Sequence, residues 1–157
     1  MTDEATFYRR AEEWLDEILV RNPVTATQLG NHQWDDRLGD RTTEALEEEY
    51  QFTLSALAEL GTYDTEQFGL NARIDHAIVS EIFGSEVRSY EKVQSHRRSP
   101  GFYLGEVMGG VFGLIVREFA PLPERLRSVL GRVREAPRVL QEGMANLAPE
   151  RVPAVWA

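Results

Sequence analysis

The side chains best suited to chemistry lie together in one stretch, Asn31–Arg41, with the sequence NHQWDDRLGDR. An imidazole and carboxylates on a single loop can bind a metal ion or a polar ligand. Their spacing here matches no established calcium or zinc pattern, so we assign no metal ligand, and a small metal-dependent enzyme that uses His32 and nearby carboxylates is only a third hypothesis. Asp and Asn also satisfy loop backbone groups and cap helices, which leaves a structural role open. The candidate binding residues, in a cleft or an interdomain loop, are His32, Trp34, Asp35 and Asp36.

No complete active site is recognisable elsewhere in the sequence. A zincin helix needs two histidines four residues apart with a glutamate between them, and the other two histidines, His76 and His96, do not have that spacing. No serine or threonine lies in a nucleophile elbow, and no glycine-rich loop precedes a helix in a phosphate-binding pattern. We therefore predict no catalytic residue and no cofactor in this chain.

The hydrophobic pattern has a helical period throughout, and no segment alternates as a strand would. The fold class predicted is all-α, with five to six helices packed as an irregular bundle. The expected helices cover residues 4–20, 23–29, 43–60, 64–90, 100–118 and 124–147, with the last one kinked or restarted at Pro137.

The stretch Ser99–Phe119 is the most apolar, and it carries glycines at 101, 105, 109 and 113. Residues four apart lie on one face of a helix, so these glycines form a shallow groove. Each glycine costs about 1 kcal/mol relative to alanine, a cost that close packing must offset. We expect this to be the central helix, with a neighbouring helix in the groove. A membrane span is disfavoured because Glu106 lies inside the stretch.

Composition points to one globular domain over residues 1–157. The absence of cysteine excludes disulfides and thiolate metal sites, and the acidic start does not resemble a secretion signal, so a cytoplasmic location is expected. Residues 1–91 carry 7 arginines and no lysine against 20 acidic residues, whereas residues 92–157 carry 10 basic residues against 6 acidic ones. The net charge of −9 disfavours nucleic-acid binding, despite a modest arginine stripe over residues 125–138.

Several loose motifs occur in a fixed order along nearly the whole chain. They are Pro23-x-x-Ala26-Thr27-x-Leu29-Gly30-x-His32-x-x-Asp35-x-x-Leu38-x-Asp40, Arg73-Ile74-Asp75, Ser99-Pro100 before an aromatic pair, Arg117-Glu118-Phe119-Ala120-Pro121, Glu124-Arg125-Leu126, Arg132-Val133, Ala136-Pro137 and Asn146-Leu147. Together they make the sequence similar to the N-terminal region of the bacterial domain of unknown function 885, DUF885.

The resemblance implies a function that the residues alone do not. Members of that family look like mostly helical, zincin-type metallopeptidases that are several times longer, with the zinc motif in their later part. That catalytic part is absent here, so no catalytic or metal residue is carried over, and zinc is expected only in the missing part. We expect a non-catalytic scaffold that contributes a cleft wall and pairs with the missing region, or self-associates through an exposed apolar face. The alternative is a stand-alone helical interaction module that dimerises or binds a protein.

Overall fold

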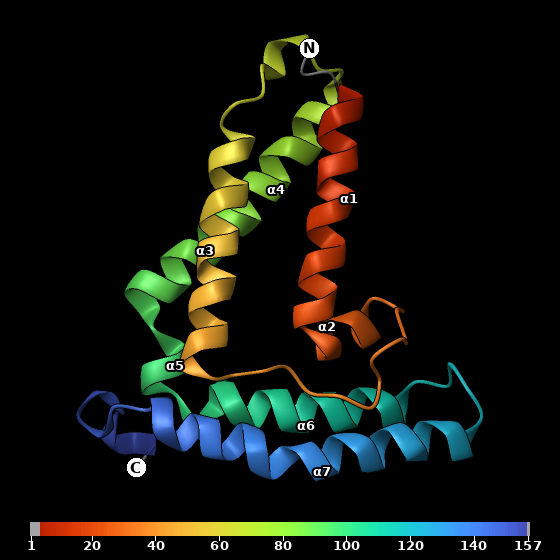
Figure 1. Cartoon of the computed structure of the whole chain (residues 1–157), viewed down its shortest axis with the longest axis vertical. Helices are drawn as coiled ribbons and strands as arrows, with labels where there is room; N and C mark the ends of the chain where they lie inside the picture. Colours follow the sequence, from red (N-terminus) through yellow and green to blue (C-terminus); the bar gives the residue numbers. More distant parts are fainter. Residues whose placement is uncertain (1–3, 157) are drawn as a thin grey trace. The chain divides into compact units, whose positions relative to one another are not determined.

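The computed structural model describes residues 4–156, and within them the fold is all-α, as predicted (Figure 1). The described residues form two compact units, one of residues 4–18 and 47–94 and the other of residues 19–46 and 95–156. Its helices are α1 (Glu4–Arg21), α2 (Pro23–Gln28), α3 (Thr43–Leu60), α4 (Leu70–Arg88), α5 (Ser95–Arg98), α6 (Pro100–Val116) and α7 (Leu122–Asn146). Short turns of other helix types are η1 (Thr65–Gln67), η2 (Ser89–Val93), η3 (Pro149–Arg151) and η4 (Ala154–Trp156).

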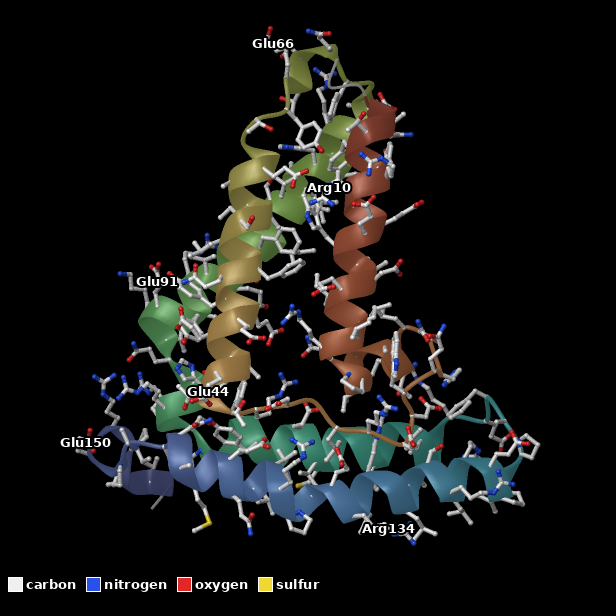
Figure 2. All side chains as sticks on the ribbon, viewed as in Figure 1. Arg10, Glu44, Glu66, Glu91, Arg134 and Glu150 are labelled. Atoms are coloured by element: carbon white, nitrogen blue, oxygen red, sulfur yellow. The ribbon has the colours of Figure 1, made fainter. Side chains whose placement is uncertain are left out.

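The first unit packs parts of α1 and α3 with α4 around an aromatic core. Its buried members are Phe7, Trp14, Ala56, Leu60, Tyr63, Phe68, Ala72 and Phe83. On the flank of this core, His76 makes a hydrogen bond of 2.9 Å through Nε2 to the carbonyl oxygen of Leu60. Arg10, labelled in Figure 2, extends from α1 and donates two hydrogen bonds to Glu59 of α3. His76 thus has a structural partner within this unit.

The second unit is built on α6 and α7, which run side by side in opposite directions (Figure 1). Helix α2 packs on α6, and a buried apolar cluster of Val24, Leu38, Tyr103 and Val139 joins them to α7. Two glycines permit the close approach. A Cβ on Gly110 would lie 2.9 Å from Leu38, and one on Gly143 would lie 2.6 Å from the Tyr103 ring.

The prediction of a helix in the groove of α6 is wrong for the described residues. A Cβ built on Gly105, Gly109 or Gly113 would meet no atom within 4 Å. Close packing instead uses Gly110, which lies outside the four-residue series. The glycine face of α6 is therefore open, with exposed neighbours such as Met108 and Phe112.

Helix boundaries follow the sequence pattern except near prolines and at the end of the chain. The expected helix over 43–60 is confirmed, whereas the expected restart at Pro137 is wrong, because α7 continues as one helix through this proline. Pro137 and Val133 are both exposed, so water can satisfy the Val133 carbonyl that loses its intrahelical donor. The expected helix over 64–90 is divided into η1 and α4, and the chain after α7 contains the short turns η3 and η4.

Among residues 4–156 no single helix is long and apolar enough to cross a membrane. Only the segments Leu70–Arg98 and Pro100–Val116, which are separated by a sharp bend, together have the length and composition of a membrane span.

Candidate functional site

The loop between α2 and α3 is held largely by side chains of α6 and α7. The guanidinium of Arg132 donates from Nε to the Arg37 carbonyl at 2.9 Å, and Arg138 reaches the carbonyls of Leu38 and Gly39 at 3.3 Å. At Gly131 the loop touches α7 so closely that a Cβ would lie 2.6 Å from the Asp36 carbonyl oxygen. The loop lacks a helical period, and distant residues fix its path instead.

A buried ion pair fixes the later part of the loop. Arg41 lies 2.9 Å from Glu106 of α6, and both side chains are at least nine-tenths buried. Glu106 also accepts a hydrogen bond of 2.7 Å from the Gly39 backbone N–H. On α7, Glu142 accepts from the Arg41 N–H, and Asn146 donates to the Arg41 carbonyl at 2.6 Å. The carboxylate in the middle of the apolar helix thus anchors the loop.

The first part of the loop carries a histidine that is oriented by a buried carboxylate. His32 Nδ1 lies 2.9 Å from Asp35 Oδ2, and Thr27 Oγ1 lies 2.6 Å from the other oxygen, Oδ1. Thr27 in turn accepts a hydrogen bond of 2.6 Å from Nη2 of Arg132, a side chain with no exposed surface. Burial lowers the pKa of Arg132, and the nearby charge of Asp35 opposes that shift. A continuous polar chain therefore runs from the core of this unit to the imidazole of His32.

The imidazole of His32 lies at a cavity of about 260 Å³. The ring of Phe119 stacks on it, with centroids 3.8 Å apart and planes 9° from parallel. The cavity is lined by His32, Asp35, Phe119, Ala120, Glu124, Arg125 and Ser128. Three segments of the second unit contribute to it: the loop after α2, the α6–α7 connection and the first turns of α7.

Of the four predicted binding residues, the structure brings His32 and Asp35 together at this cavity. Trp34 is half-buried and does not line it. Asp36 is exposed, with its backbone against Gly131. Asp40, the last carboxylate of the loop, accepts hydrogen bonds from the N–H and hydroxyl of Thr42. Burial acts to raise the pKa of Asp40, but these bonds outweigh it and hold the pKa below its usual value, as in a helix cap.

Sequence reasoning missed two buried arginines of the site. Arg125 and Arg132 were expected to lie on a basic surface stripe, yet both are buried. They are seven residues apart, and Val139 follows seven residues later on the same buried face of α7. That spacing was a usable signal, because positions seven apart share a helix face. Phe119 and Ser128 carry no such signal.

No group of three or more metal-binding side chains close enough to hold a metal ion occurs within residues 4–156. His32 and Asp35 can each exchange hydrogen bonds with a ligand at this cavity.

One solved structure and one family model match this chain. A solved structure of a "putative lipoprotein of unknown function" from Shewanella oneidensis is similar, with a TM-score of 0.80 and 24% sequence identity. The similarity covers 94% of this chain but only 26% of that chain, so this chain spans about a quarter of that protein's length. At this identity the likeness shows the fold alone. No curated protein matches this chain.

A match between the sequence and a family model identifies the family of this chain. The model of the family described as bacterial protein of unknown function (DUF885) matches residues 23–155, a range that includes the loop, the cavity and both buried arginines. The chain belongs to the DUF885 family.

Proposed function

We propose that this chain is a non-catalytic helical scaffold within a longer DUF885 protein, where it supports a catalytic region formed by other residues. The observation that carries the proposal is the comparison with the solved relative, in which the same fold makes up 26% of the chain. The zinc-dependent hydrolase or peptidase activity implied by the family resemblance would belong to the rest of such a protein. In this proposal the loop with His32 forms one wall of its cleft.

The outer surface of α7 supports a role in packing against a further element. After Leu122 in the first turn, its exposed large apolar residues are Leu126, Leu130, Val133, Leu140 and Met144, and with Pro137 these five recur at alternating intervals of four and three. This is the spacing of a helix–helix seam. The open glycine face of α6 adds the exposed side chains of Leu104, Met108 and Phe112. So many large apolar groups on one helix pair are typical of a surface that another protein element covers.

The first experiment is to measure the mass of the native product with an antibody raised against this region. A band several times heavier than 17.9 kDa supports the scaffold proposal, whereas a band at 17.9 kDa contradicts it. Fractionating the same lysate tests location. A cytoplasmic product is part of our proposal, and recovery with membranes would favour the lipoprotein relationship instead.

The second candidate is a stand-alone module that dimerises through the same seam on α7. In that case sedimentation analysis of the 17.9 kDa chain would show a dimer, and Leu130→Glu would convert it to a monomer. The control is Leu70→Glu in the other unit, which changes an even more exposed leucine on α4. A monomer at all concentrations would exclude this candidate.

A further inference from the structure

We propose that the cavity beside His32 binds a small monocarboxylate that also carries a hydrogen-bond donor, such as a 2-hydroxy or 2-amino acid. The proposal does not depend on the scaffold role, because this chain alone lines the cavity. It rests on two nitrogen atoms, Arg125 Nη2 and His32 Nε2, whose hydrogen-bonding capacity the described residues leave unused.

Arg125 is a buried cation whose hydrogen bonds all go to neutral acceptors. Nε donates to the Ala120 carbonyl at 2.9 Å, and Nη1 donates to the carbonyls of Leu114 and Ile115 at 3.1 and 2.8 Å. The side chain of Arg125 is only 8% exposed, and no carboxylate of residues 4–156 forms an ion pair with it. A buried charge without a counter-ion is costly, so a carboxylate entering the cavity would supply what this guanidinium lacks.

The geometry also leaves a donor free on Arg125. No described residue accepts a hydrogen bond from Nη2, and within residues 4–156 no buried side-chain nitrogen or oxygen lacks a partner. Nη2 must therefore reach solvent, and Arg125 lines the cavity. Planar N–H groups of this kind bind carboxylates with charge-assisted hydrogen bonds.

His32 contributes a hydrogen-bond acceptor, because its contact with Asp35 determines the tautomer of the imidazole. An ionised Asp35 can only accept, so the hydrogen of the neutral imidazole lies on Nδ1 and the lone pair lies on Nε2. No described residue bonds to Nε2, and the contact of Nδ1 with Asp35, together with the stacked Phe119 ring, orients the imidazole. A ligand hydroxyl or ammonium group in the cavity can donate a hydrogen bond to this lone pair.

Size and charge narrow the ligand class further. About 260 Å³ holds a ligand of a few heavy atoms with some water, given about 30 Å³ for each water molecule. Glu124 also lines the cavity, and its charge opposes a second negative group on the ligand. Dianions such as phosphate are therefore expected to bind less well than monocarboxylates. Ser128 provides one further hydroxyl for a polar ligand.

The test is an NMR titration of the histidine ring signals with L-lactate, acetate, propan-1-ol and inorganic phosphate. The His32 signals are assigned with His32→Gln, and His76 and His96 serve as internal controls. We expect saturable shifts of His32 alone with L-lactate, at a Kd on the order of 1 mM for so small a ligand. Acetate, which lacks the donor, should bind about fivefold more weakly, and propan-1-ol, which lacks the carboxylate, should not bind.

Two variants separate the parts of the proposal without altering Arg125, whose loss would expose three carbonyls. His32→Gln should remove the preference for lactate over acetate, measured at the Arg125 side-chain signal, while weak carboxylate binding remains. Glu124→Gln should tighten lactate binding about threefold by removing a like charge. The proposal is overturned if His32 shows no saturable shift with lactate, if His76 and His96 shift equally, or if phosphate binds as tightly as lactate. None of these results bears on the mass of the native product.

Discussion

Arg132 Nη2 donates a hydrogen bond of 2.6 Å to Thr27 Oγ1, and the two residues are 105 positions apart in the sequence. The same guanidinium also reaches the carbonyls of Arg37, Gly110 and Pro23. One side chain of α7 therefore joins α2, the loop and α6. Since Thr27 bonds to Asp35, the orientation of His32 depends on a residue that does not touch it.

Arg132→Met should destabilise the second unit by about 3 kcal/mol or more, because buried acceptors lose their donor while Asp35 loses a nearby positive charge. Urea unfolding followed by tryptophan fluorescence measures the change. The matched control is Arg134→Met. Arg134, labelled in Figure 2, is exposed on the side of α7 away from α6, so this change should cost less than about 0.5 kcal/mol. Equal effects of the two substitutions would contradict the network described here.

Asp35→Asn and Asp36→Asn compare two adjacent carboxylates with different surroundings. Asp35 is buried and accepts from Thr27, whereas Asp36 is exposed and its nearest cation, Arg37, lies 3.9 Å away. We expect Asp35→Asn to cost about 1–3 kcal/mol and Asp36→Asn less than about 0.5 kcal/mol in the same unfolding experiment. A larger effect at Asp36 would show that the loop is held differently.

Glycine-to-alanine substitutions should have opposite signs at two positions. At Gly131 the new Cβ would lie 2.6 Å from backbone of the loop, which cannot yield easily, so Gly131→Ala should destabilise the protein. At Gly109 nothing lies within 4 Å, and Gly109→Ala should stabilise α6 by about 1 kcal/mol. Thermal unfolding of both variants of the 157-residue chain tests this. Destabilisation by Gly109→Ala would indicate that another molecule already fills the groove.

The pair Arg10–Glu59 predicts a pH dependence for the first unit. Hydrogen bonds from Arg10 lower the pKa of the Glu59 carboxyl below its usual 4.5. The resulting stabilisation is complete above the pKa of the unfolded chain and is lost as pH falls through the lower folded pKa.

Both side chains are about one-third exposed, so Glu59→Gln should cost no more than about 1 kcal/mol near neutral pH. The difference from the parent should vanish in strong acid. Glu12→Gln, which alters an exposed carboxylate on α1, should show no such pH-dependent difference. A cost of Glu59→Gln that persists unchanged below its folded pKa would contradict the ion-pair explanation.

The sequence pattern was sufficient to predict features whose interacting residues lie close together in the sequence. Helix α3 was predicted over 43–60 because its leucines repeat at helical spacing and Gly61 follows it. Likewise, His32 and Asp35 could be grouped from the sequence because they lie three positions apart in a short loop. In both cases the residues that interact are near neighbours in the sequence.

The partners of that loop were not predictable in the same way. In the sequence, Glu106 served only as an argument against a membrane span. Its ion-pair partner, Arg41, lies 65 residues away in the sequence, so the pair could not be predicted from local spacing. The glycine series of α6 suggested a covered groove. Residue spacing alone, however, does not determine on which side of a helix the neighbouring elements pack. Tertiary contacts decide that, and a single sequence does not contain them explicitly.

The loop after α2 also has a consequence for biosynthesis. Arg132, Arg138, Glu142 and Asn146 bond to it from about 95 to 105 residues further along the chain. The ribosome therefore releases the loop long before it releases the groups that hold it. During translation His32 and Asp35 remain unplaced until α7 has emerged, so the candidate site is completed only when synthesis of this region is nearly over.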